Sequence, residues 1–531
     1  MDSEPRPAGQ AIVEQLAACG ADLAFGVPGE SYLDVLDALR DSSIRFVTCR
    51  QEGGAGYAAE ATAKLTGRPG VVLVTRGPGA TNVSVAVHTA QQDETPLLVL
   101  VGLIPTSQRH RDAFQEFELA GLFGSMSKAT YVLDDPDAGP ELIRRAWITA
   151  VAGRPGPVVV GLPEDVLARP TTAAVVAPGE RFEPAPPPGC AERVLDLLRR
   201  ADRPLVLVGG SRWDDEAIGL LDTTLAGVPV ATSFRRQDLV DHRSPRFVGT
   251  LGLGVDPTLV ARCDRADLVV VIGDTLGDAT TAGSTRFGGP VPSMPIVQVH
   301  PDEREVAKVY SCTLGVVSTP GRFLQDLARA ERAEPLLDRW TAWRDELRQG
   351  YERWSTGGGE GESLARTLRD LLADDAIVTT GAGNFTRPLQ RAFRFGRPGR
   401  FLAPVSGSMG YGLPAALAAS LVHPDRSVVA VVGDGELFMT VQELATVAHT
   451  GATVGVIVVD NGRYGTIRTH QDRRFPGRPF AVDLTNPDVA SVALAFGMAA
   501  RQATGHAEAE GALRELVAGR GSWLLHWRVD A

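Results

Sequence analysis

Two oxygen-bearing side chains, Asp434 and Asn461, each come directly after a short apolar run near the C-terminus. The runs, 427–432 and 454–459, are predicted to be buried strands, with a helix over 437–450 between them. Parallel strands end at a common edge, and open α/β sheets bind ligands at that edge. We therefore expect Asp434 and Asn461 to lie close together at the end of a parallel sheet.

Oxygen ligands of this kind suit Mg²⁺, which is often held by one carboxylate and by phosphate oxygens of a cofactor. The turn that follows Asn461, Gly462-Arg463-Tyr464-Gly465, has backbone carbonyls that can add a third oxygen. A helix starting after Gly435 would offer free N–H groups to an anion. The alternative is that Asp434 only caps this helix, as an isolated Gly-Asp-Gly more often does. The pairing with Asn461 favours the metal site.

Composition narrows the class of protein. The chain has 531 residues, 44% hydrophobic and 22% charged, which is ordinary for a soluble globular protein. Its net charge of -11 and the lack of a basic block argue against a nucleic-acid partner. No apolar run reaches the roughly 18 residues of a membrane helix. The five scattered cysteines, and an acidic, polar start with no signal peptide, predict a reduced, cytoplasmic protein.

Helical and strand-like stretches alternate along the whole chain in three blocks, which predicts an α/β protein of three doubly wound parallel-sheet domains. We place an N-terminal domain at 1–170, a central domain at 190–335 and a C-terminal domain at 360–531. A Pro- and Ala-rich stretch, 169–189, reads as a linker between the first two. The three blocks suggest an internal duplication, although no sequence repeat is strong enough to prove it.

The step of 27 positions from Gly-Asp-Gly to an asparagine at a strand end resembles the binding signature of thiamine-diphosphate enzymes. The family usually has two asparagines in a row, and here the first is Asp460. The resemblance implies that Asp434, Asn461 and the carbonyl of Arg463 hold Mg²⁺. The implied cofactor-binding residues around them are Gly433, Asp434, Gly435, Glu436, Asn461 and Tyr464.

Other segments extend the resemblance over nearly the whole chain. Residues 407–414, Gly-Ser-Met-Gly-Tyr-Gly-Leu-Pro, resemble the acetolactate synthase segment that grips the aminopyrimidine of the cofactor, which implies contacts from Gly407 and Met409. Gly383-Asn384 resembles the loop that touches the diphosphate. In the first block the resemblance rests on Arg50-Gln51-Glu52, on Gly-Pro-Gly-Ala-Thr-Asn at 77–82 and on Phe114-Gln115-Glu116. The implied order is pyrimidine-binding, central and diphosphate-binding domains.

By resemblance, Glu52 is the catalytic carboxyl that shares a proton with the cofactor's pyrimidine ring. Taken by itself, Glu52 is better explained as a helix-start residue favoured by the helix dipole. Met409 is implied to be an apolar wedge that bends the cofactor, and its alternative is a Met that fills a gap in the core.

Six further side chains are expected around the substrate. Gln115 and Phe114 would line the substrate side, and His470, on a loop after Tyr464, is a candidate proton donor or a surface histidine. Weaker expectations of the same kind fall on Glu30, Ser31 and Arg76, where Arg76 can equally pair with a nearby acid.

The resemblance implies decarboxylation of a pyruvate-like 2-oxo acid and transfer of the enamine or acyl unit to a second carbonyl acceptor. No His-His pair occurs, and Thr75-Arg76 stands where benzoylformate decarboxylase has a histidine, which favours this carboligation over aldehyde release. Non-oxidative decarboxylation and a non-catalytic cofactor-binding subunit stay open as alternatives.

The same resemblance implies a homodimer or homotetramer with active sites at the dimer interface. It also suggests FAD as a cofactor of the central domain, although Ile272-Gly273-Asp274-Thr275 does not match the family's usual flavin-binding sequence.

Overall fold

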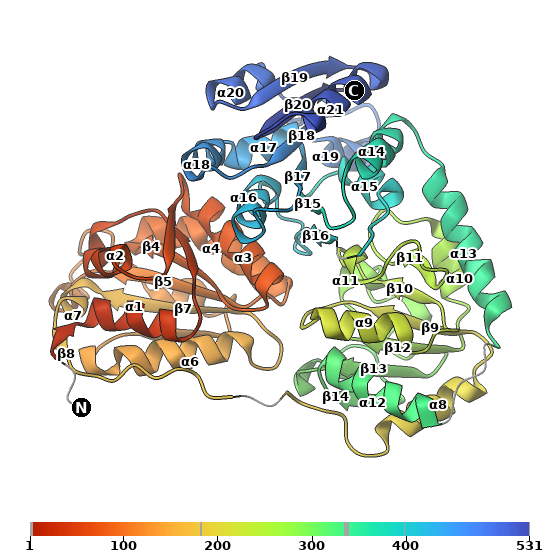
Figure 1. The fold of residues 1–531 in the computed structure, drawn as a ribbon, viewed down its shortest axis with the longest axis horizontal. Coiled ribbons are helices and arrows are strands. Elements are labelled where there is room, and N and C mark those ends of the chain that lie inside the picture. Colours follow the sequence, from red (N-terminus) through yellow and green to blue (C-terminus); the bar gives the residue numbers. More distant parts are fainter. Residues whose placement is uncertain (1–3, 181–182, 334–338, 398, 530–531) are drawn as a thin grey trace. The chain divides into compact units, whose positions relative to one another are not determined.

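The computed structural model describes residues 4–180, 183–333, 339–397 and 399–529 (Figure 1). The backbone divides into two compact units. Unit 1 consists of 1–180, 378–384 and 402–531, and unit 2 of 181–377 and 385–401. Each unit is built on parallel sheets covered by helices, so the predicted fold class is confirmed.

The N-terminal sheet of unit 1 has the strand order β3-β2-β4-β5-β7-β6, and all its pairings are parallel. Its strands are β2 (Leu23–Gly26), β3 (Arg45–Thr48), β4 (Gly70–Thr75), β5 (Leu97–Leu103), β6 (Ala129–Val132) and β7 (Pro157–Pro163). Its helices are α1 (Ala8–Ala18), α2 (Leu33–Arg40), α3 (Glu52–Thr66), α4 (Arg76–Gln92), α5 (Leu119–Phe123), α6 (Gly139–Val151) and α7 (Glu164–Leu167). The central strands β4, β5 and β7 are almost wholly buried because helices cover both faces. A separate two-stranded ribbon pairs β1 (Arg6–Pro7) with β8 (Pro170–Thr171).

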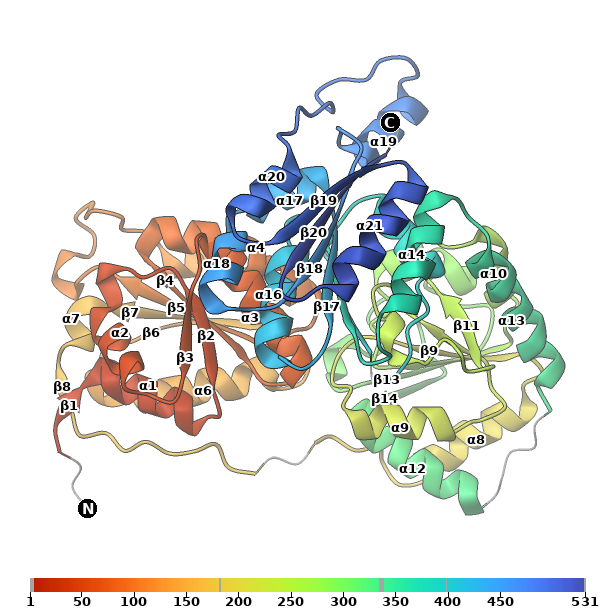
Figure 2. The ribbon, with the colours of Figure 1, turned by 45° about the horizontal axis from the view of Figure 1, so that its top comes forward.

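The C-terminal sheet has the order β16-β15-β17-β18-β20-β19. Counted from the first strand of each sheet, this is the same 2-1-3-4-6-5 order as in the N-terminal sheet. Its strands are β15 (Ile377–Thr380), β16 (Arg400–Leu402), β17 (Val428–Gly433), β18 (Gly455–Asp460), β19 (Ala499–Thr504) and β20 (Trp523–Arg528). Its helices are α16 (Gly412–Val422), α17 (Asp434–Thr440), α18 (Glu443–Thr450), α19 (Gly465–Arg474), α20 (Val489–Ala495) and α21 (His506–Ala518). Within unit 1, α16 packs along α3, as Figure 2 shows.

The sheet of unit 2 has a different order, β11-β10-β9-β12-β13-β14, again all parallel. Its strands are β9 (Pro204–Val208), β10 (Val230–Thr232), β11 (Phe247–Thr250), β12 (Leu268–Ile272), β13 (Ile296–His300) and β14 (Leu314–Val317). The helices of unit 2 are α8 (Cys190–Arg200), α9 (Asp215–Thr223), α10 (Pro257–Cys263), α11 (Asp278–Thr281), α12 (Pro320–Ala333), α13 (Thr341–Thr356), α14 (Glu360–Leu371) and α15 (Thr386–Ala392). This 3-2-1-4-5-6 order is that of a dinucleotide-binding fold.

The prediction of one helix over 437–450 is wrong, because the chain forms α17 and α18 with a break at Val441 and Gln442. All five cysteines are free thiols, as expected. Among the described residues, no helix is both long enough and apolar enough to span a bilayer.

Candidate active site

The carboxyl ends of β17 and β18 bring Asp434, Asp460 and Asn461 to one edge of the C-terminal sheet. Gly433 is paired with Val459 across the two strands, so Asp434 lies level with Asp460, and Asn461 follows. Asp434 is almost fully buried at the start of α17. The geometry at this edge is therefore the one that the two apolar runs predict.

An asparagine that sequence reasoning missed joins the two carboxylates. The Asn486 side-chain amide donates to Asp434 Oδ2 at 2.7 Å and to Asp460 Oδ1 at 2.9 Å. Asp460 Oδ2 in turn lies 2.8 Å from Nε2 of His526, a buried residue on β20. Asp434, Asn486, Asp460 and His526 thus form one continuous chain of polar contacts.

The two carboxylates respond oppositely to this environment. Burial raises the pKa of Asp434 above its ordinary value, and the nearby Asp460 adds to the effect. Burial also acts to raise the pKa of Asp460, but hydrogen bonds from His526 and the Gly462 N–H outweigh it and hold that pKa below the ordinary value. Asp460 is therefore the carboxyl that favours its charged form. Asp434 is the one whose charged form a bound cation would stabilise more.

The turn after β18 presents further oxygens. The Arg463 N–H donates to Asn461 Oδ1 at 3.2 Å, and the Arg463 carbonyl accepts from the Gly465 N–H at 2.9 Å. In the described part of the chain, no group of three His, Cys, Asp or Glu side chains is placed to hold a metal. A site here would use one carboxylate, one amide and one carbonyl, an all-oxygen set that fits Mg²⁺.

Glycine is required where backbone and side chains crowd at this edge. A Cβ on Gly381, at the end of β15, would come 1.9 Å from Glu436 Oε1, and one on Gly435 would come 2.7 Å from the Tyr464 ring. Glu436 is buried and accepts from the Gly412 N–H at 3.2 Å. These close approaches explain why the predicted cofactor segments are rich in glycine.

The loop predicted to touch the diphosphate lies against α19. The Asn384 N–H donates to Thr466 Oγ1 at 3.1 Å, and its side-chain amide donates to Thr469 Oγ1 at 3.3 Å. Gly383 precedes it in the same loop. His470 is exposed on α19, directly after Thr469, so it lies on a helix and not on the loop that the sequence suggested. Its role stays a prediction.

Met409 lies half-buried in an irregular segment between β16 and α16. Gly407 has a φ of 71°, and a Cβ built on it would meet nothing within 4 Å, so space is open beside this backbone. The Tyr57 hydroxyl, on α3, donates to the Met409 carbonyl at 3.3 Å.

Glu52 is the first residue of α3, just after the carboxyl end of β3. The Asn82 amide, on α4, donates to Glu52 Oε2 at 2.8 Å, and Gly79 leaves a Cβ-sized space 3.5 Å from Oε1. Both residues belong to the Gly-Pro-Gly-Ala-Thr-Asn segment, 77–82. This segment therefore orients the predicted catalytic carboxyl.

A second glutamate, which was not predicted as a site residue, holds the start of α3. Glu443 is fully buried on α18 and accepts from the backbone N–H groups of Arg50 and Gln51 at 3.1–3.3 Å. A Cβ on Gly54 would lie 2.8 Å from its Oε1. In the sequence, the segment Gln442-Glu443-Leu444 resembles a helix of thiamine-diphosphate enzymes, and this resemblance is the signal that could have identified Glu443.

The remaining N-terminal candidates also follow strand ends. Arg76 is the first residue of α4, and its guanidinium pairs with Glu30 at 2.9 Å and Glu164 at 2.7 Å. It therefore forms ion pairs with nearby acids, which is the alternative that the sequence left open. Ser31 is buried with its hydroxyl 2.5 Å from that of Thr75.

The Phe114-Gln115 segment follows β5. The Gln115 carbonyl accepts from the Gly77 N–H at 3.1 Å, and Phe114 is 74% exposed. An aromatic side chain this exposed next to the glycine-rich segment is available to a ligand or to another chain.

Comparison with known proteins identifies the family of the chain. Models of the thiamine pyrophosphate (thiamine diphosphate) enzyme family match in three parts: the N-terminal TPP binding domain at 6–122, the central domain at 191–327 and the C-terminal TPP binding domain at 381–527. The acetolactate synthase large subunit of Parasynechococcus marenigrum is 31% identical over 509 residues, which is 92% of this chain and 82% of the relative. That of Corynebacterium glutamicum is 31% identical over 518 residues, or 93% and 82%. The isozyme 2 large subunit of Escherichia coli is 29% identical over 530 residues, or 98% and 95%. The chain therefore belongs to the family of thiamine-diphosphate-dependent enzymes that includes the acetolactate synthases.

Proposed function

We propose that this enzyme decarboxylates a pyruvate-like 2-oxo acid and transfers the remaining acyl unit to a second carbonyl acceptor. The observation that carries the proposal is Glu52, held by Asn82 at the carboxyl end of a strand, in a chain whose relatives are named acetolactate synthases. Bound thiamine diphosphate supplies the nucleophilic carbon and stabilises the charge left by departing CO₂.

The chain's own residues divide into holding and proton-handling roles. Asp434, Asn461 and the Arg463 carbonyl would bind Mg²⁺ and, through it, the diphosphate. Glu52 would hold a proton against the pyrimidine ring, with Met409 packed beneath the cofactor. Gln115 and Phe114 would line the substrate side of the site, and His470 would be a proton donor.

Arg76 supports transfer over simple aldehyde release. Its guanidinium is engaged by Glu30 and Glu164, and by resemblance Thr75-Arg76 stands where benzoylformate decarboxylase has a histidine. A permanently charged guanidinium does not release a proton near neutral pH. This position would therefore supply no proton for aldehyde release, which favours transfer to a second carbonyl acceptor.

Turnover with pyruvate alone, in the presence of thiamine diphosphate and Mg²⁺, separates the candidates. An acyloin or acetolactate product supports the proposal, and acetaldehyde supports the decarboxylase. If no 2-oxo acid yields CO₂, the chain is a non-catalytic subunit that binds the cofactor.

Glu52→Gln is the sharpest single substitution. Because it removes the proton but keeps the size, we expect turnover to fall by about 10² to 10⁴ while cofactor still binds. Glu141→Gln, also in the first turn of a helix but exposed, is the matched control and should leave turnover unchanged. Full activity in Glu52→Gln with bound cofactor would disprove the proton role.

Two features of the assembly belong to the same proposal. We expect a homodimer or homotetramer with active sites at the dimer interface, which light scattering of the purified protein measures. If the central domain binds FAD, the purified protein shows flavin absorption. If that absorption is not seen, the proposed cofactors are thiamine diphosphate and Mg²⁺.

A further inference from the structure

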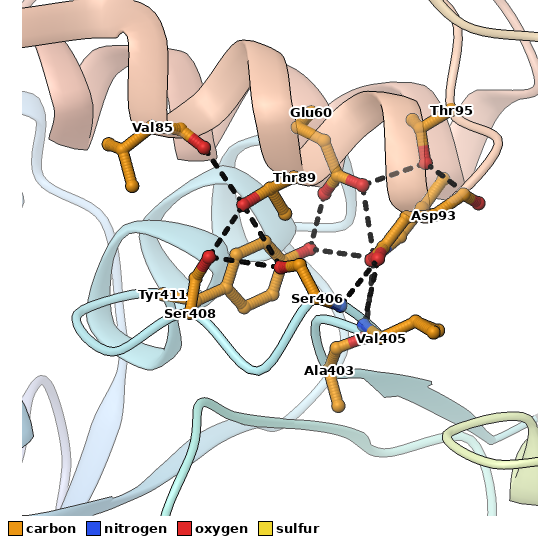
Figure 3. A network of polar contacts seen from close by, with 11 residues as sticks. Glu60, Val85, Thr89, Asp93, Thr95, Ala403, Val405, Ser406, Ser408 and Tyr411 are labelled. Atoms are coloured by element: carbon orange, nitrogen blue, oxygen red, sulfur yellow. Dashed lines mark hydrogen bonds and ion pairs between the residues drawn. The ribbon is translucent and has the colours of Figure 1, made fainter. Parts of the chain in front are cut away.

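Three charged side chains are buried together beside the segment that carries Met409, and Figure 3 labels two of them, Glu60 and Asp93. Glu60 and Lys64 lie one turn apart on α3, and Asp93 follows the end of α4. Their side chains are 0–5% exposed. The Lys64 ammonium pairs with Glu60 at 3.0 Å and also with Asp93. Two carboxylates and one ammonium leave an excess negative charge that further donors must satisfy.

The donors come from the irregular segment 403–411. Asp93 Oδ1 accepts from the backbone N–H groups of Val405 at 2.7 Å and Ser406 at 3.3 Å. The Tyr411 hydroxyl donates to Glu60 Oε2 at 2.6 Å, while Lys64 donates to the Ala403 carbonyl at 3.3 Å. The buried charges therefore hold both ends of the segment.

The middle of the segment is held by hydroxyl groups. Thr89 on α4 shares hydrogen bonds with Ser408 at 2.8 Å and Ser406 at 3.2 Å. The Tyr57 hydroxyl donates to the Met409 carbonyl at 3.3 Å. All of these partners lie on α3 or α4, the two helices that also carry Glu52 and Asn82.

The backbone of 403–411 needs such support because it forms neither helix nor strand and has positive φ at Gly407 and Gly410. Each added hydrogen bond removes alternative conformations of the free protein. A segment fixed before its ligand arrives loses less conformational entropy on binding.

We propose that Asp93 and Tyr57 are positioning residues, and that the Glu60–Lys64–Asp93 cluster fixes segment 403–411 so that Met409 is presented to the cofactor before it binds. This rests on the proposed function only in taking thiamine diphosphate as the ligand of Met409. Neither residue acts on the reacting atoms; both act through the backbone of the segment.

Asp93→Asn is the first test. Asparagine keeps only one acceptor oxygen, so its NH₂ group must face either the Lys64 ammonium or the Val405 and Ser406 N–H groups, and Lys64 loses one of its two carboxylate partners. We expect the dissociation constant for thiamine diphosphate, measured by calorimetry at saturating Mg²⁺, to rise at least tenfold. Amide hydrogen exchange of 404–411 should become faster in the absence of any cofactor.

Tyr57→Phe is the second test, chosen because it keeps the ring and removes only the hydroxyl. We expect a weakening of cofactor binding of about three- to tenfold, the range of a single hydrogen bond. Exchange should rise at Met409 and Gly410 more than elsewhere. This variant decides the matter if Asp93→Asn does not fold.

Asp137→Asn is the matched control. Asp137 lies in the same N-terminal part of unit 1 but accepts from Thr171 Oγ1 at 2.5 Å, away from segment 403–411. It should alter stability alone, with wild-type cofactor affinity.

A purely structural role would lower the melting temperature of Asp93→Asn and Tyr57→Phe while leaving cofactor affinity and exchange of 404–411 at wild-type values, and that result overturns the inference. Tight cofactor binding without product from any 2-oxo acid would defeat the proposed function alone. A wild-type protein that binds no thiamine diphosphate would defeat both.

Discussion

Asp460 replaces an asparagine of the family's usual pair, and its surroundings show how the chain accommodates the extra charge. Beside an Asp434 carboxylate, a second carboxylate would be repulsive unless donors face it. Asn486 donates to both, and His526 meets the far oxygen of Asp460. The replacement therefore comes with partners that keep Asp434 free to face a cation.

The sequence predicts Asp434 and Asn461 as site residues because a buried strand followed by a polar residue leaves a local pattern. It missed Asn486 and His526 because their importance depends on contacts 26 to 66 positions away in the chain, which no local pattern reports. The same holds for Asp93, whose partners Val405 and Ser406 lie more than 300 positions away.

Asn486→Ala tests the shared amide. Without it, two buried carboxylates face each other with no common donor, and Asp434 loses the contact that orients it. We expect the Mg²⁺ concentration needed for half-maximal cofactor binding to rise by about 10- to 100-fold, as for other residues that orient metal ligands. The measurement is a Mg²⁺ titration of thiamine diphosphate binding. A change of less than twofold would show that Asn486 does not orient Asp434.

At the scale of elements, the sheets put every candidate of the first block behind the carboxyl end of β2, β3, β4 or β5. The apolar runs at 427–432 and 454–459 predicted β17 and β18, since a strand covered on both faces needs apolar residues throughout. The strands that were not predicted include the four-residue edge strands β6, β11 and β14, and also β15, β16, β19 and β20 of the C-terminal sheet.

The break between α17 and α18 is the other departure from prediction, and it has a consequence for Glu52. A new helix starts at Glu443, and that side chain binds the backbone N–H groups just before α3. Periodicity alone showed a continuous helical stretch because the break involves only Val441 and Gln442. The position of Glu52 thus depends on an element from the opposite end of the sequence.

Glu443→Gln tests this contact through pH. Burial raises the pKa of Glu443 above 4.5, partly offset by a hydrogen bond from Thr446. A raised folded-state pKa contributes stability below the unfolded value, and that contribution is lost as pH rises through the folded value. Each unit of the shift corresponds to about 1.4 kcal/mol.

Glutamine has the same shape and no such loss. As pH rises from 4.5 to 8 in matched buffers, the melting temperature of wild type should therefore fall relative to that of Glu443→Gln. Glu141→Gln should run parallel to wild type over this range. A constant gap between Glu443→Gln and wild type would show that Glu443 is not held in its neutral form.

For the whole molecule, the candidate residues divide unequally between the units. All of them fall in unit 1, whose two sheets share one strand order, while unit 2 has its own order and contains none of them. The shared order gives physical support to the duplication suggested by the repeating blocks, which sequence similarity alone could not establish. The stability of unit 2 can therefore be probed without touching the candidate site.

His242 makes that probe possible because it is buried in unit 2 with its ring stacked on Phe247 at 4.0 Å. Its Nε2 lies 3.0 Å from the Gln237 carbonyl and donates to it. Burial lowers its pKa from 6.5 to about 3. Between these values the unfolded chain binds a proton that the folded unit does not, so stability is lost as pH falls.

The loss should approach about 1.4 kcal/mol for each pH unit below 6.5. Hydrogen exchange of the β9 and β12 amides, followed from pH 7 to 5 after correction for intrinsic rates, measures the stability of unit 2 directly. His242→Gln should be less stable at pH 7 but lose less on acidification, whereas His506→Gln, in unit 1, should keep the wild-type slope. Equal slopes in all three proteins would mean that His242 takes up its proton without unfolding, and that the interior of unit 2 admits a charge.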